Sequence, residues 1–79
     1  MLKIVDVDYI KDYQIVLTFN NGKVKNVDLS DKLKGSLFEP LKDLDLFIQF
    51  GLVNGTIEWV NGADFAPEYL FRIGKALNL

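Results

Sequence analysis

Three Asn-Gly pairs, at positions 21–22, 54–55 and 61–62, mark where this chain is expected to reverse direction. Asn and Gly adopt the positive φ angles that tight β-hairpin turns need, whereas most other residues resist them. Segments in which apolar and polar residues alternate flank the first two pairs, and this alternation is typical of strands that bury one face. The sequence therefore predicts antiparallel hairpins.

Three strands are expected before residue 30. The first has Val5, Val7 and Tyr9 on its buried face and aspartates on the other, and the next two form a hairpin. A two-residue loop in that hairpin would set Leu17 opposite Asn26. A three-residue loop with a bulge would instead pair Ile15 with Val27, and we favour it because two apolar residues then meet. The three expected strands span 3–9, 13–19 and 23–29.

The second hairpin is expected to bury the only tryptophan. A tight turn at Asn54-Gly55 pairs Leu52 with Ile57 and Phe50 with Trp59, over strands 49–53 and 56–60. Trp59 then faces the core, and Glu58 faces outward because neighbouring residues in a strand point in opposite directions.

Helical segments are expected between and after these strands. Ser30 can cap a turn closed by Gly35, and Asp43 can cap a short helix that points Leu44 and Phe47 inward. Pro67 suits the first position of a terminal helix. That helix is expected to reach Leu77, with Leu70, Ile73, Gly74 and Leu77 on one stripe. The predicted fold is a single α+β domain over 1–79, with a largely antiparallel sheet of about five strands, a short helical insert and a C-terminal helix.

The composition excludes several chemistries. The 79 residues include no Cys and no His, so disulfides, thiol nucleophiles, thiolate or imidazole zinc sites and histidine general bases are absent. No cofactor or metal is predicted. A core of this size stabilises a chain by only about 3–5 kcal/mol, and dimerisation would add to that. No apolar run approaches a membrane span and no signal peptide is evident, so a cytoplasmic bacterial-type protein is expected.

The charge balance disfavours nucleic acid as a partner. Nine basic residues against eleven acidic ones give a net charge of −2, which repels phosphate overall. Nucleic-acid binding remains an alternative only where folding gathers Lys23, Lys25, Lys32 and Lys34 into one patch.

The segment from Trp59 to Pro67 contains the candidate site. Trp59 is expected to be a core side chain whose indole N–H bonds a backbone carbonyl, and Asn61-Gly62 a turn rather than a phosphate cradle. Asp64 is expected to accept N–H groups from the turn or the first turn of the following helix. The alternative pairs Asp64 with Glu58 or Glu68 as two carboxylates for acid–base chemistry or Mg²⁺ binding.

Residues 13–70 resemble the small bacterial domain family of unknown function numbered 2442. The resemblance lies in a strand ending in Thr-Phe, a Gly turn, Asp-Leu-Ser, and above all the motif W-x-N-G-A-D-x-x-P formed by Trp59, Asn61, Gly62, Ala63, Asp64 and Pro67. One departure is Val60, where the family commonly has proline. The resemblance implies a compact α+β domain without an established activity.

The same resemblance implies further expectations about partners. Longer members add a helix-turn-helix segment that would bind DNA, and members often occur beside a second small protein in pairs that look like toxin–antitoxin modules. Nucleic-acid binding is therefore not expected without that extension.

The sequence favours a non-enzymatic interaction domain that binds a protein partner or forms a homodimer. Its expected surface is either the second face of the sheet, carrying Val16 and Val53 with Val27 as a further candidate, or an unpaired edge strand. An antitoxin-like role is the more specific form of this expectation. The alternatives are a carboxylate-based metal-dependent enzyme and a nucleic-acid-binding accessory protein.

Overall fold

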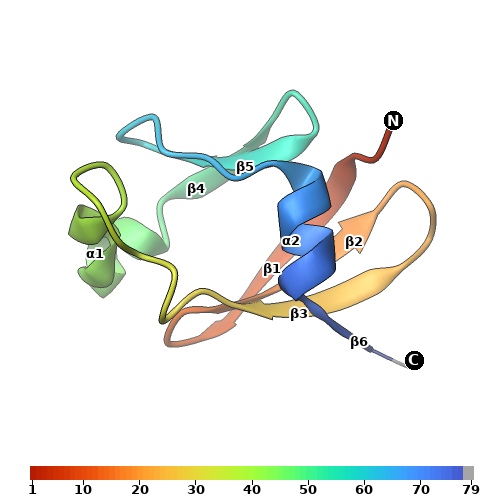
Figure 1. The fold of residues 1–79 in the computed structure, drawn as a ribbon, viewed down its shortest axis with the longest axis horizontal. Helices are drawn as coiled ribbons and strands as arrows, with labels where there is room; N and C mark the ends of the chain where they lie inside the picture. The colour runs from red at the N-terminus through yellow and green to blue at the C-terminus, as the bar shows by residue number, and fades with distance from the viewer. Residues whose placement is uncertain (78–79) are drawn as a thin grey trace.

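The protein folds into two antiparallel sheets with three short helical segments, as seen in a computed structural model that describes residues 1–77 (Figure 1). The expected α+β class is confirmed, but the strands divide between two sheets, and a short sixth strand is present. One sheet has the strand order β1-β2-β3-β6 and the other pairs β4 with β5. The elements are β1 (Ile4–Lys11), β2 (Gln14–Phe19), β3 (Val24–Asp28), the 3₁₀ helix η1 (Glu39–Lys42), α1 (Leu44–Phe47), β4 (Phe50–Val53), β5 (Thr56–Trp59), α2 (Pro67–Ile73) and β6 (Lys75–Ala76).

The β2–β3 hairpin uses the three-residue loop with a bulge. Ile15 lies opposite Val27, as favoured from the sequence. The Phe19 N–H donates to the Lys23 carbonyl at 2.9 Å, and Gly22 has a φ of 84°. This positive φ is why glycine suits the bulge position.

The β4–β5 hairpin also has the expected register. Asn54 and Gly55 have φ angles of 53° and 81°, as a type I′ turn requires. Leu52 pairs with Ile57, and Phe50 pairs with Trp59.

Strand β1 contains a bulge that the alternating pattern does not reveal. Ile4 pairs with Phe19 and Asp6 with Thr18, so Val5 is the extra residue between them. Val5 is exposed, and Ile4 takes the core position instead. The expectation that Val5 faces the core was wrong because one inserted residue exchanges the faces of the strand.

The terminal helix is shorter than expected. It begins at Pro67 as predicted but ends at Ile73, and Gly74 is extended with a ψ of 152°. The chain then pairs with β3, and the Leu77 N–H donates to the Val24 carbonyl at 3.0 Å. The helical extension to Leu77 was wrong because pairing with the edge of β3 satisfies more backbone groups than another helical turn on the surface.

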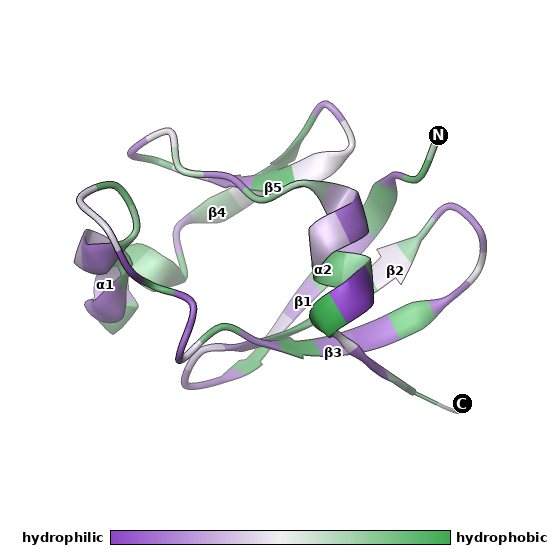
Figure 2. Ribbon diagram, viewed as in Figure 1, coloured by the Kyte–Doolittle hydropathy of each residue, from purple (hydrophilic) through white to green (hydrophobic). Residues whose placement is uncertain are grey.

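One core joins the two sheets and the helices. Strands β1 to β3 form one layer, β4 and β5 form the other, and α2 lies on the viewer's side in Figure 1. Apolar and polar residues follow one another along β3 and around α2, as Figure 2 shows by colour. Leu44 is exposed, contrary to expectation, since Phe47 is buried and Leu46 packs against the core instead. The fully buried large side chains are Trp59, Phe19, Phe47, Ile15, Leu17, Leu29, Leu33, Leu41, Ile57, Leu70 and Val27.

Candidate functional site

Trp59 is a core residue. Its side chain is 2% exposed, and the indole Nε1 donates a hydrogen bond of 2.7 Å to the Phe47 carbonyl. The rings of Phe47, Phe50 and Phe65 lie around it, with centroid distances of 5.7, 6.3 and 5.9 Å. The expected burial and the bond to a backbone carbonyl are both confirmed, and no face of the indole is left for a ligand.

The Asn61-Gly62 pair forms a turn of the same kind as the β2–β3 turn. The Gly62 N–H donates to the Trp59 carbonyl at 2.9 Å, the Trp59 N–H donates to the Ala63 carbonyl at 2.8 Å, and the Gly62 φ is 87°. The Asn61 side chain accepts from the Ala63 N–H at 3.1 Å and donates to the Leu37 carbonyl at 2.8 Å. Asn61 therefore fixes the turn and ties the 35–38 loop to it.

Val60 occupies the first central position of that turn. Proline is favoured at this position in a type I turn because its fixed φ matches the geometry. The departure of Val60 from the family pattern is therefore compatible with the same turn.

Asp64 does not cap the following helix. Its side chain is exposed and makes no hydrogen bond within residues 1–77. The N-cap residue is Ala66, without a side-chain cap, and Pro67 stands in the first turn as predicted. The expected capping role of Asp64 was wrong: the Ala63 N–H of the turn is bound by Asn61, and Pro67 at the start of the helix has no N–H to donate.

The structure brings two of the three candidate carboxylates together. Glu58 and Asp64 form an isolated antiparallel bridge, so their side chains lie on one face of the backbone pair. Glu68 lies in the first turn of α2 and is exposed. Over the described 1–77 range, no group of three or more potential ligands assembles. Asp64 is exposed and Glu58 is half-buried, and two carboxylates are fewer than the six to eight oxygen ligands of a preformed Ca²⁺ site.

The four lysines considered for nucleic-acid binding do not form one patch. Lys25 lies near the start of β3 and places its Nζ 4.3 Å from the Phe71 ring centroid. Lys32 lies beyond the other end of β3 and pairs with Asp31 at 3.8 Å. The nucleic-acid-binding alternative required all four lysines in one patch, and this requirement is not met.

The expected apolar second face is also absent. Val27 is fully buried in the core, Val53 belongs to the other sheet, and Val16 lies opposite Asp8 and Asn26 on the outer face. The outer face of the four-stranded sheet is therefore mostly polar.

Two inward-facing apolar side chains remain accessible on edge strands β1 and β4. Tyr9 is directly opposite the fully buried Ile15, yet it is 40% exposed; Leu52 is opposite the fully buried Ile57, yet it is 41% exposed. Cross-strand partners share a sheet face, so both side chains point toward the interior from the rim of their sheets. Neither β1 nor β4 has a neighbouring strand on its outer side in the part of the chain described. We give the name β1–β4 opening to the incompletely buried inward side chains of these two strands: Val7, Tyr9, Phe50 and Leu52.

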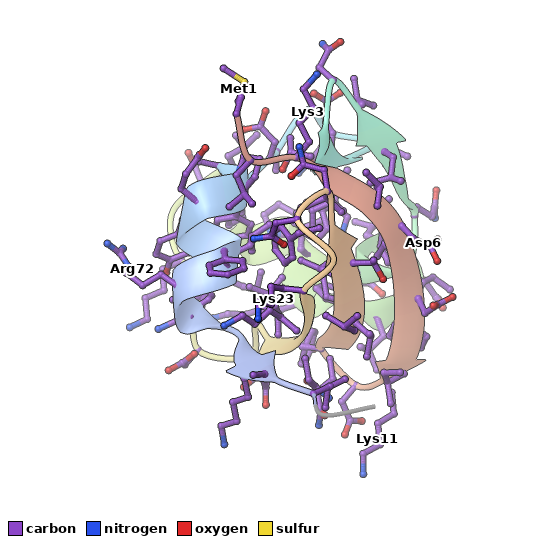
Figure 3. The ribbon with its side chains drawn as sticks, turned by 90° about the vertical axis from the view of Figure 1, so that its right-hand side faces the viewer. Met1, Lys3, Asp6, Lys11, Lys23 and Arg72 are labelled. Atoms are coloured by element: carbon purple, nitrogen blue, oxygen red, sulfur yellow. The ribbon has the colours of Figure 1, made fainter. Side chains whose placement is uncertain are left out.

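Tertiary contacts bound the β1–β4 opening at both ends. At one end the Ile4 N–H donates to the Gly55 carbonyl at 2.8 Å. At the other, the Phe47 ring lies 6.3 Å from the ring of Tyr9. Figure 3 shows β1 and the β4–β5 hairpin on the side of the molecule opposite α2. Sequence reasoning assigned Tyr9, Leu52 and Phe50 to buried faces, and no local signal shows that β1 and β4 are edge strands.

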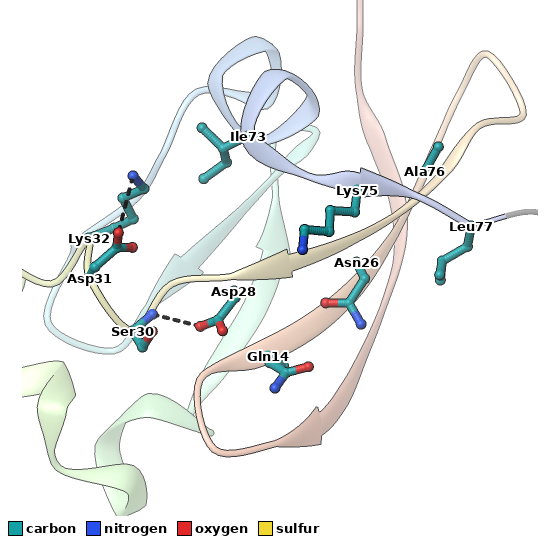
Figure 4. A pocket seen from close by; sticks show the side chains of 10 residues that line it. All are labelled: Gln14, Asn26, Asp28, Ser30, Asp31, Lys32, Ile73, Lys75, Ala76 and Leu77. Atoms are coloured by element: carbon teal, nitrogen blue, oxygen red, sulfur yellow. Dashed lines mark hydrogen bonds and ion pairs between the residues drawn. The ribbon is translucent and has the colours of Figure 1, made fainter.

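A second recess is polar. It lies beside β6 and under the end of α2, as Figure 4 shows. The Asp28 side chain accepts from the Ser30 N–H at 2.9 Å at one end of it, and Lys75 crosses above Asn26. Its remaining polar walls are Gln14, Asp31 and Lys32.

Fold and site together define a small α+β domain whose conspicuous motif is structural and whose edge strands β1 and β4 leave inward-facing apolar side chains accessible. The chain belongs to the family described as protein of unknown function DUF2442, whose model matches residues 4–76. No curated protein and no solved structure matches it. Among residues 1–77, no helix has the length and apolar character needed to cross a membrane.

Proposed function

We propose that this protein is a non-enzymatic interaction domain that binds another protein through the β1–β4 opening. The observation that carries the proposal is the paired exposure of Tyr9 and Leu52, each opposite a fully buried residue of its own sheet. A partner side chain that completes the burial of either one would contribute about 1 kcal/mol, because full burial of such a side chain is worth roughly 1.5–3 kcal/mol.

The charges near the β1–β4 opening favour a basic partner. Residues 3–12 and 42–45 together contain five aspartates and three lysines: Asp6, Asp8, Asp12, Asp43 and Asp45 against Lys3, Lys11 and Lys42. Two copies facing each other through this surface would bring like charges together. The proposed occupant is therefore a separate polypeptide with apolar anchors and basic flanks, rather than a second copy.

The family resemblance suggests where to look for this polypeptide. Members that occur beside a second small protein make the neighbouring protein the first partner to test. The family resemblance is the only support for an antitoxin-like role. Identifying the partner would decide whether this protein has that role.

Site-specific photo-crosslinking in the source organism tests the proposal. A crosslinkable phenylalanine analogue at Leu52 is expected to give one discrete adduct, and the same analogue at Leu37 is the control. Leu37 is 46% exposed but lies in the loop before η1, away from the β1–β4 opening. Replacing Asp6 and Asp8 by Asn is expected to weaken the Leu52 adduct. Equal adducts at both positions, no adduct, or an adduct of twice the chain's own mass would refute the proposal.

A further inference from the structure

Strand β6 is a second unpaired edge, at the opposite side of the four-stranded sheet from β1. Lys75 and Ala76 pair with β3, and no strand within residues 1–77 pairs with their other side. The Leu77 N–H points toward β3, where it meets the Val24 carbonyl at 3.0 Å. Backbone groups alternate in direction along a strand, so the N–H and C=O of Ala76 point away from β3. These two groups are available to an added strand.

Recesses lie on both faces of this edge. The polar recess of Figure 4 lies on one face, and a second recess lies between the β2–β3 turn and Phe71. Both are lined by Ala76 and Leu77. An extended peptide beside β6 would direct alternate side chains into the two recesses, which is how strand addition obtains specificity beyond backbone hydrogen bonds.

The second recess is basic and partly apolar. Lys23 and Lys25 line it, with Phe71 as its aromatic wall, and no acidic residue contributes to it. Lys25 lies over the Phe71 ring at 4.3 Å, which holds its ammonium group at the recess. In the polar recess, by contrast, Lys32 is already paired with Asp31. The charge that an incoming peptide meets at β6 is therefore positive, from Lys23, Lys25 and Lys75.

We propose that β6 binds an extended acidic segment of a separate polypeptide as an additional antiparallel strand of the sheet. Its backbone pairs with Ala76, its carboxylates lie against Lys23 and Lys25 in the second recess, and its alternate, apolar side chains contact Ile73 and Leu77 in the recess of Figure 4. Only one residue of β6 supplies outward backbone groups, so the affinity depends strongly on charge and falls as salt screens it. This surface is separate from the β1–β4 opening, so a failure of either proposal leaves the other standing.

An NMR titration of the full chain tests this proposal with a defined probe. The probe is a short, end-blocked peptide of alternating Glu and Val. We expect saturable shifts of the amide signals of Lys23, Lys25, Lys75 and Ala76. One control peptide carries Lys in place of Glu, and a second carries N-methyl groups on alternate backbone nitrogens. Neither is expected to bind. Equal shifts from either control, shifts confined to β1, or no shifts would overturn the proposal.

A matched pair of variants tests the backbone contact. Ala76→Pro removes the outward N–H without removing a bond of the β3–β6 pairing, since proline is accepted on an edge strand where its N–H side faces solvent. We expect it to weaken binding about fivefold relative to Ala76→Val, which changes the same side chain but keeps the N–H, as the loss of one hydrogen bond implies. The Leu77 amide reports whether β6 itself stays paired, through its protection from hydrogen exchange. Binding by Ala76→Pro as tight as that of Ala76→Val, with β6 intact, would refute strand addition.

A second copy could in principle supply the acidic strand. Light scattering of the protein alone decides this, and we expect a monomer at the concentrations of the titration. An oligomer that dissociates on the Ala76→Pro substitution would show that a second copy, and not a separate polypeptide, supplies the strand beside β6.

Discussion

Removing the indole N–H of Trp59 should cost a large share of the stability of this domain. The bond to the Phe47 carbonyl is 2.7 Å long and lies in a side chain that is 2% exposed, so no water can replace the lost donor. An unsatisfied buried carbonyl costs about 1–3 kcal/mol. Trp59→Phe also leaves a cavity, for which we expect about 1 kcal/mol more. A total near 3 kcal/mol is a large share of the about 3–5 kcal/mol that a core of this size supplies.

Urea denaturation followed by far-ultraviolet circular dichroism measures this loss, since the variant has no tryptophan fluorescence. A benzothienylalanine at position 59 is the matched control, because it keeps the shape of the indole and replaces its N–H by sulfur. We expect the control to lose about 1–3 kcal/mol and Trp59→Phe to lose more. A benzothienylalanine protein as stable as wild type would refute the role assigned to the hydrogen bond.

Three further comparisons test the turn chemistry and the close packing. Gly62→Ala forces a non-glycine residue to a φ of 87° and should cost about 1–2 kcal/mol in urea denaturation, whereas Gly51→Ala, in open space on β4, should be neutral or stabilise by about 0.5 kcal/mol. Asn61→Ala loses the bonds to the Ala63 N–H and the Leu37 carbonyl and should cost about 1–2 kcal/mol, while Asp64→Ala should stay within about 0.5 kcal/mol of wild type; an equal cost for both would contradict the assigned roles. Gly74→Ala would place a Cβ atom 2.8 Å from the Lys25 Cβ and should cost about 1–3 kcal/mol, with faster hydrogen exchange of the Leu77 amide; unchanged exchange would show that β6 does not depend on this approach.

The hairpins could be predicted from the sequence because their turn chemistry is local. Asn54 and Gly55 adopt positive φ angles that few other residue types tolerate, and the apolar pairing across the turn then follows from counting outward. The same reasoning selected the β2–β3 register. The burial of Trp59 followed directly from its place opposite Phe50.

The errors occurred where tertiary contacts override the local pattern. Val5 continues the alternation of β1, but the bond from the Ile4 N–H to the Gly55 carbonyl is made between segments far apart in the sequence. Gly74 and Leu77 fit a helical stripe, yet the chain after Gly74 pairs with the edge of β3 and forms β6. Neither competing contact is visible in a window of a few residues.

The proposed binding surface could not be predicted from the sequence, for a related reason. Tyr9 and Leu52 have the periodicity of core residues, and their pairing with Ile15 and Ile57 confirms that they face inward. They stay exposed because β1 and β4 are edge strands without a neighbour in residues 1–77, which depends on the topology of the two sheets. A carboxylate pair, by contrast, was foreseen, and the structure brings Glu58 and Asp64 side by side without the further ligands that a metal would need.

The affinity for the crosslinked partner, measured with purified components, tests most directly whether the β1–β4 opening is the binding surface. Leu52→Ser removes an apolar contact worth about 1 kcal/mol, so we predict about fivefold weaker binding. Leu37→Ser, which truncates a similarly exposed leucine outside the β1–β4 opening, should bind as wild type. Equal affinities for the two variants, with both folded, would contradict the account.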